Sequence, residues 1–86
     1  MKQFSKKIFV NQIDKAYALV GTASRHNEDI DLVSGRYVVN ARSLMGIFSL
    51  DLSSEITVVI HTDDDAAANI FFKELEQVGI ACHEII

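Results

Sequence analysis

The residues of this chain whose side chains could carry out chemistry are three histidines, His26, His61 and His83, and one cysteine, Cys82. Histidine titrates near neutral pH, so it is the side chain that most often moves protons or binds metals there. A single cysteine excludes an internal disulfide and a thiolate-rich metal site. Any catalytic or metal-binding role would therefore have to come from the surroundings of the histidines.

The neighbours of the three histidines favour structural roles. We expect His26 to be a solvated loop residue, because it follows a polar helix end. His61 precedes three aspartates at 63–65, which cannot converge on one ion from a helix start, so they are better explained as caps. His83 and Cys82 are adjacent and would point to opposite faces of an extended segment. We therefore predict no catalytic pair, no metal site and no cofactor.

The composition is typical of one small folded domain covering residues 1–86. With 49% hydrophobic and 23% charged residues, the chain is close to the globular average. Eight basic residues against twelve acidic ones, at scattered positions and with a net charge of −4, argue against nucleic-acid binding. No stretch approaches the ~20 apolar residues that span a bilayer, and no export signal is recognisable. We expect a cytoplasmic protein that does not enter membranes.

Hydrophobic periodicity and turn residues predict an α+β domain. The predicted strands are residues 5–10, 30–33, 36–40 and 55–61, and the predicted helices are residues 13–25, 43–50 and 62–78. Ser34 and Gly35 are turn residues that make the second and third strands a hairpin. The long helices would cover one face of a small antiparallel sheet, which is a two-layer sandwich. Residues 80–86 are either a frayed tail or a short final strand.

The helices also carry end signals and apolar stripes. Asn11 and Asp14 form a plausible reciprocal cap for the first helix, Ser43 suits the N-cap of the short helix, and Gly79 suits a C-terminal cap. The stripe predicted to be buried on the first helix is Ile13, Ala16, Leu19, Val20 and Ala23. On the last helix it is Ala67, Ile70, Phe71, Leu75 and Val78.

Residues 35–50 place Gly35, Asn40, Ser43, the Met45-Gly46 pair and Leu50 at a characteristic spacing. This segment resembles the matching part of HPr, the histidine-containing phosphocarrier of the bacterial sugar phosphotransferase system. Residues 55–58 and 63–78 resemble the fourth strand and the acidic-start third helix of that family. The resemblance implies an HPr-like open-faced two-layer sandwich, with a four-stranded antiparallel sheet covered by three helices on one face.

The start of the first helix departs from the family pattern. Continuing the resemblance without gaps puts Gln12 at the family's phosphoryl-accepting histidine, Asp14 at the arginine that steadies the phosphoryl group, and Lys15 at a proline. Glutamine does not form a phosphoramidate, and the Asp14 carboxylate would repel a phosphoryl group at a helix N-terminus. The resemblance therefore implies a protein that is neither a phosphocarrier at this position nor an enzyme.

Two further family features are retained. Ser43 matches a serine that regulatory kinases phosphorylate in some relatives, although an N-cap role alone would also explain it. Leu44, Met45 and Phe48 match an exposed apolar patch that docks partner proteins. We therefore predict a regulatory or interaction protein related to the phosphotransferase system, with protein partners and no nucleic-acid or membrane partner.

Two alternatives remain open. The chain could carry a phosphoryl group on a different acceptor, such as His26. It could also be a small-molecule-binding ferredoxin-like βαββαβ module, with residues 80–86 as its last strand. The short helix predicted at 43–50 disfavours the second alternative, because that topology has no helix there.

Overall fold

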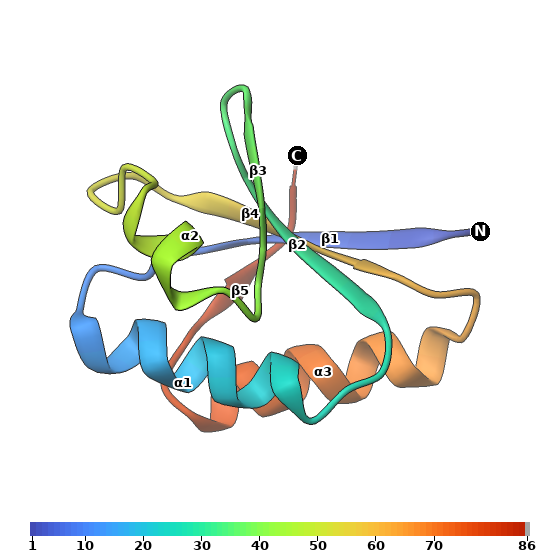
Figure 1. Ribbon diagram of the computed structural model, residues 1–86. Helices are drawn as coiled ribbons and strands as arrows, with labels where there is room; N and C mark the ends of the chain where they lie inside the picture. The colour runs from blue at the N-terminus through green and yellow to red at the C-terminus, as the bar shows by residue number, and fades with distance from the viewer. Residues whose placement is uncertain (86) are drawn as a thin grey trace.

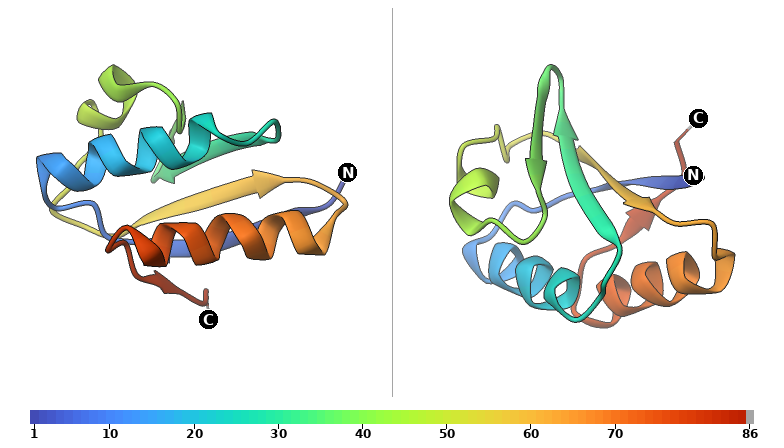
Figure 2. Two further views of the ribbon diagram at one scale, coloured as in Figure 1. Left: turned by 90° about the horizontal axis from the view of Figure 1, so that it is seen from below. Right: turned by 45° about the vertical axis from the view of Figure 1, so that its right-hand side comes forward.

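Two long helices lie across one face of an antiparallel sheet in the computed structural model, which describes residues 1–85. The strands are β1 (Gln3–Ile8), β2 (Asp29–Ser34), β3 (Tyr37–Asn40), β4 (Ile56–His61) and β5 (Cys82–His83), in the order β3-β2-β4-β1-β5. The helices are α1 (Ile13–Ser24), α2 (Leu44–Phe48) and α3 (Asp65–Gln77). Figures 1 and 2 show α1 beside α3 under the sheet, with the short α2 next to α1. The predicted α+β sandwich is confirmed.

The core lies between the sheet and the long helices. Alternate residues of β2 and β4 face the helices and are buried, because successive side chains of a strand point to opposite faces. These strand residues are Ile30, Leu32, Ile56, Val58 and Ile60. The helices contribute Ala16, Leu19, Ala23, Ala68, Phe71 and Leu75. No helix of residues 1–85 covers the opposite face of the sheet, which leaves polar side chains such as Asp31 and His61 there partly exposed (Figure 1).

Several local turns form as the sequence predicts. Gly35 opens the two-residue β2–β3 turn with a φ of 60°, a conformation that glycine adopts without steric cost. Gly79 follows α3 with a φ of 89° and donates its N–H to the Glu76 carbonyl oxygen, while the Ile80 N–H donates to Leu75. This pair of hydrogen bonds is a Schellman motif, so the predicted C-terminal cap is confirmed.

The predicted cap of α1 is wrong. Gln12 is the N-cap residue, and its side chain makes no capping hydrogen bond. The Asp14 carboxylate instead accepts from the backbone N–H of Lys15, at 3.0 Å, and Asn11 precedes the cap. Both residues lie one position too early for the predicted cap, and the Gln12 carbonyl oxygen accepts from the N–H groups of Lys15 and Ala16 instead.

The predicted apolar stripes are partly wrong. Ile13 on α1 is 68% exposed, and Ile70 and Val78 on α3 are 54% and 40% exposed. Their places in the core are taken by Thr22 on α1 and by Ala68 and Phe72 on α3. Ala16, Leu19 and Ala23 on α1 and Phe71 and Leu75 on α3 are buried as predicted, so each buried stripe is rotated from the predicted one by less than the roughly 100° that separates neighbouring residues.

The C-terminal segment contains a short strand, so the sheet has five strands within the described residues where four were predicted. In β5, Cys82 pairs with Ile8 and His83 with Lys7. Cys82 packs toward the core and His83 is exposed, as expected for opposite faces. Burial raises the pKa of the Cys82 thiol to about 11. The rest of the predicted tail includes residue 86, which lies outside the described residues.

The ferredoxin-like alternative does not fit this topology. Although β5 joins the sheet, α2 separates β3 from β4, and the sheet has one strand more than a βαββαβ module. Within residues 1–85, no helix is both long enough and apolar enough to cross a bilayer.

Candidate functional site

The start of α1 lies where the resemblance places phosphoryl chemistry. Gln12 has extended backbone angles, φ −137° and ψ 148°, and its carbonyl oxygen accepts from the N–H groups of Lys15 and Ala16. The Gln12 and Asp14 side chains are both exposed. This helix end thus presents a neutral amide and a carboxylate to solvent. Neither is a nitrogen nucleophile, and the carboxylate occupies the positive end of the helix dipole.

Ser43 begins α2 as predicted. Its hydroxyl oxygen accepts from the Gly46 N–H at 3.1 Å, and its carbonyl oxygen accepts from Ile47 at 3.0 Å. Ser43 is half-buried. A β-carbon on Gly46 would lie 3.1 Å from the Ser43 oxygen and 3.1 Å from the β-carbon of Val39, so glycine allows this close packing.

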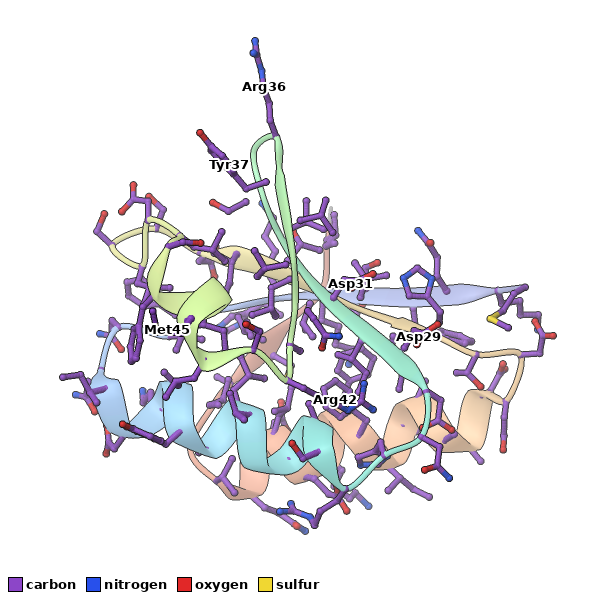
Figure 3. All side chains as sticks on the ribbon, in the orientation of Figure 1. Asp29, Asp31, Arg36, Tyr37, Arg42 and Met45 are labelled. Atoms are coloured by element: carbon purple, nitrogen blue, oxygen red, sulfur yellow. The ribbon has the colours of Figure 1, made fainter. Side chains whose placement is uncertain are left out.

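The three apolar residues predicted on α2 are unequally exposed. Met45 is 82% exposed and Phe48 is 43% exposed, whereas Leu44 packs partly against the core. Ile47, which is fully buried, anchors the helix instead. Met45, which Figure 3 labels, and Phe48 are therefore the large apolar residues that α2 leaves exposed.

The structure adds three exposed apolar residues that sequence reasoning missed. Phe9 is 40%, Ile13 68% and Tyr17 59% exposed, and they lie before and along the N-terminal half of α1. This half of α1 is next to α2, as Figures 1 and 2 show. Ile13 and Tyr17 are four residues apart, a spacing that could have indicated a second apolar face. We call the set the α1–α2 surface: Phe9, Ile13, Tyr17, Leu44, Met45 and Phe48.

His26 is not the solvated loop residue that was predicted. Its side chain is 12% exposed, and its Nε2 lies 2.6 Å from the Glu74 Oε1 of α3. Its Nδ1 lies 3.7 Å from the Glu28 carboxylate, and the ring meets Phe71 edge-on at 5.4 Å between centroids. His26 therefore ties the end of α1 to α3. The sequence could not show this contact, because Glu74 is 48 residues away.

Of the aspartates that follow His61, Asp64 caps α3 as predicted, and His61 itself makes a contact that was not predicted. His61 Nε2 lies 3.1 Å from the Asp31 carboxylate on the neighbouring strand. Asp64 caps α3 by accepting from the Ala66 N–H at 2.9 Å, and Asp63 accepts from the Lys2 N–H at 2.7 Å. The part of the chain covered by residues 1–85 contains no group of three or more His, Cys, Asp or Glu side chains arranged to hold a metal.

A shallow cavity of about 280 Å³ lies at the other end of α1 from the α1–α2 surface. It is lined by the loop before β2 and the loop after β4, with Glu28, Asp29, His61 and Asp63 among its residues. Met1, Asn27 and Thr62 complete its lining. The cavity and the α1–α2 surface are therefore separate features.

Comparisons with known proteins define first the class and then the family. The fold is the open-faced sandwich of small phosphocarrier domains, because solved structures of that kind match nearly the whole chain. A family model described as "PTS HPr component phosphorylation site" matches residues 2–78. The chain belongs to the HPr family.

Three solved structures illustrate the similarity. HPr-C-His from Thermoanaerobacter tengcongensis is 27% identical with a TM-score of 0.66, and the match covers 91% of this chain and 94% of that one. The phosphocarrier protein HPr from Bacillus anthracis strain Ames is 26% identical with a TM-score of 0.64, over 86% and 98%. The histidine-containing phosphocarrier protein of a Mycoplasma is 21% identical with a TM-score of 0.66, over 90% of each chain, and supports the fold alone.

Proposed function

We propose that this HPr-family protein acts by binding other proteins through the α1–α2 surface, and that it does not carry a phosphoryl group at the start of α1. One observation carries the proposal. The helix start presents Gln12 and Asp14, while large apolar side chains beside it are left exposed. Several large apolar side chains exposed on two neighbouring helices of a small domain exceed the scattered apolar background and are a feature of protein-binding sites.

The residues at the start of α1 support the loss of phosphoryl transfer. A phosphocarrier histidine attacks phosphorus with a ring-nitrogen lone pair and forms an N–P bond. The lone pair of the Gln12 amide nitrogen is delocalised into its carbonyl group and is not nucleophilic. The Asp14 carboxylate adds a negative charge where a phosphoryl group would otherwise meet free N–H groups. Binding is the activity that remains.

Ser43 is the proposed point of regulation. Its hydroxyl is half-buried at the N-cap of α2, beside the exposed Met45. A phosphate on Ser43 would carry about −1.5 to −2 charges and would meet free N–H groups of the helix start. Phosphorylation would thus change the charge next to the α1–α2 surface. We propose partners connected with the sugar phosphotransferase system, because that is the system the family serves.

Replacing Phe48 by alanine is expected to remove the protein's specific partners in pull-downs. Truncation of an interface aromatic typically weakens binding by about 2 kcal/mol, or roughly 30-fold. Phe48 is 43% exposed, so the fold should tolerate the change. Ser43→Asp should alter the captured set by adding charge beside Met45. Captured proteins would be quantified by mass spectrometry.

Ile70→Ala is the matched control for Phe48→Ala. Ile70 is also an exposed apolar residue, at 54%, but it lies on α3 outside the α1–α2 surface. Ile70→Ala should leave the set of captured proteins unchanged. Identical partner sets for the wild type, Phe48→Ala and Ser43→Asp would contradict the proposed function.

The second candidate, phosphoryl transfer to His26, meets an unfavourable site. Both ring nitrogens face carboxylates, Glu74 at 2.6 Å and Glu28 at 3.7 Å, and the side chain is 12% exposed. A dianionic phosphoryl group would be repelled by both carboxylates and would need space that the packed ring lacks. The argument in favour of His26 is its residue type, since histidine is the usual phosphoryl acceptor in this family.

Incubation with phosphoenolpyruvate and enzyme I of the phosphotransferase system is expected to leave the mass of this protein unchanged. Intact-mass spectrometry at neutral to mildly basic pH, where phosphohistidine survives, is the measurement. The Bacillus anthracis HPr serves as the positive control for the reaction. A stoichiometric phosphoryl adduct on the wild type, lost in His26→Asn, would establish the second candidate instead.

A further inference from the structure

The α1–α2 surface is bordered by two carboxylates. Asp14 lies in the first turn of α1, directly after Ile13 and three residues before Tyr17. Asp51 lies three residues beyond Phe48, in the segment that leaves α2. Both side chains are exposed. The apolar side chains of the surface thus have an acidic residue near each of the two helices that carry them.

These carboxylates are not neutralised within residues 1–85. Neither Asp14 nor Asp51 belongs to any of the salt bridges of the described chain. Asp51 accepts from the Ser53 hydroxyl at 2.5 Å and from the Ser53 N–H at 3.1 Å. These hydrogen bonds lower the pKa of Asp51, so its carboxylate stays ionised at neutral pH.

Four of the eight basic side chains are committed elsewhere, among them Arg25, which donates to the Gly21 carbonyl oxygen and lies 4.0 Å from the Glu74 carboxylate. Lys2 pairs with Asp65 at 3.6 Å, and Lys6 lies over the Phe72 ring and 3.3 Å from Glu84. Arg42 binds backbone carbonyls near the end of α1.

None of the remaining four basic residues forms a salt bridge with Asp14 or Asp51 in the described chain, and Lys73 lies on α3, outside the α1–α2 surface. Arg36 extends into solvent from the tip of the β2–β3 hairpin (Figure 3). Lys7 lies on the helix-free face of the sheet, since its neighbour Ile8 faces the core. Lys15 is half-buried on α1 and is the basic residue closest in sequence to Asp14. The border of the α1–α2 surface is therefore net acidic.

We propose that the partner docked by this surface is a protein segment whose apolar side chains are flanked by lysine or arginine. This inference rests on the proposed function and adds the chemistry of the partner to it. Apolar side chains of the partner would cover Ile13, Met45 and Phe48, and its basic side chains would meet the two carboxylates at the solvent-exposed border. An acidic partner, a nucleic acid or an anionic lipid surface would be repelled there.

Charge at such a border acts mainly on association and on partner choice. Pairs at an exposed border contribute little net affinity, but like charges facing each other are unfavourable, and opposite charges accelerate encounter in a salt-dependent way. Where the family pattern has an arginine, Asp14 reverses the charge. The reversal should direct this protein toward partners different from those that an arginine at this position would select.

Two synthetic helical peptides test the inference. Both carry the same leucine and phenylalanine stripe, and they differ only in having lysine or glutamate at the flanking positions. Binding to the ¹⁵N-labelled full chain would be followed by amide chemical-shift changes. We expect the lysine peptide to bind about 10-fold more tightly at low salt, with shifts at Ile13, Met45 and Phe48, and the difference to shrink at about 0.5 M salt.

Charge-neutralising variants distinguish the effect of the two carboxylates on binding from the effect of the apolar side chains. Asp14→Asn combined with Asp51→Asn should bring the two peptides to within about 2-fold of each other. Asp29→Asn removes one charge from an exposed residue at the start of β2 and should leave the preference unchanged. Circular dichroism would confirm that each variant remains folded.

The outcomes distinguish this inference from the proposed function. If both peptides bind equally to the wild type and both are weakened by Phe48→Ala, the charge selection is wrong and the docking surface stands. Preferential binding of the glutamate peptide would also overturn the inference. If neither peptide shifts resonances of the α1–α2 surface, or if Phe48→Ala has no effect on binding, the docking surface itself is contradicted.

Discussion

Replacing Phe71 by alanine is expected to lower the free energy of unfolding by about 3–5 kcal/mol. Phe71 is fully buried on α3, and its ring lies 5.4 Å from the His26 ring and 5.5 Å from the Phe72 ring, between centroids. The substitution removes this apolar area from the core and leaves a cavity between α3, the end of α1 and the sheet. Domains of this size have about 5–15 kcal/mol of stability in total, so a large fraction would be lost.

Urea unfolding followed by circular dichroism measures the Phe71 effect. Ile70→Ala is the matched control, because the neighbouring Ile70 is 54% exposed and its loss should cost less than about 0.5 kcal/mol. The ratio between the losses of unfolding free energy in the two variants also tests which side of α3 faces the core. Equal losses would mean that α3 buries both side chains, as the apolar spacing of the sequence alone predicted.

Replacing Arg42 by alanine is expected to lower the free energy of unfolding by about 2–4 kcal/mol. The Arg42 guanidinium donates to the carbonyl oxygen of His26 and, at 2.8 Å, to that of Glu28. Both carbonyls belong to the loop that connects α1 to β2. Without the guanidinium, partly buried acceptors lose their donor, and the loop that holds His26 against Glu74 loses its main constraint.

Two controls accompany Arg42→Ala in the same unfolding experiment. Arg36→Ala removes an arginine that points into solvent at the hairpin tip (Figure 3), so its effect should stay within about 0.5 kcal/mol. Arg42→Lys keeps a cationic donor without the guanidinium fork, and an intermediate loss is expected. Faster amide exchange at residues 26–29 in Arg42→Ala would locate the effect. A loss no larger than that of Arg36→Ala would show that the loop holds without this contact.

The stability and binding experiments address opposite ends of α1. Phe71 and Arg42 act around His26 at the C-terminal end, whereas the α1–α2 surface lies at the N-terminal end. A helix of 12 residues separates the two ends by about 18 Å. Variants at the C-terminal end of α1 should therefore leave partner binding unchanged, provided that the protein remains folded. Variants of the α1–α2 surface should leave the free energy of unfolding nearly unchanged.

The sequence by itself determined the order of the elements and several of their ends. These features come from local signals. They are the period-2 and helical spacings of apolar residues, the turn at Gly35, the N-cap at Ser43 and the C-terminal cap at Gly79. Each depends on backbone preferences within a few residues, so neighbouring residues are enough to predict it. The family pattern of residues 35–50 and the lack of any histidine before His26 also belong to the sequence alone.

The tertiary structure decided which sides of the helices are buried and what surrounds His26. Ile13 and Ile70 have the spacing of core residues but are exposed, because the sheet and the neighbouring helix bury a stripe that is turned slightly away from both. His26 is enclosed by Glu74 and Phe71, which the packing of α3 brings to the end of α1. Burial depends on contacts between residues far apart in the chain, so the local pattern predicted part of each buried stripe but neither its edges nor the partners of His26.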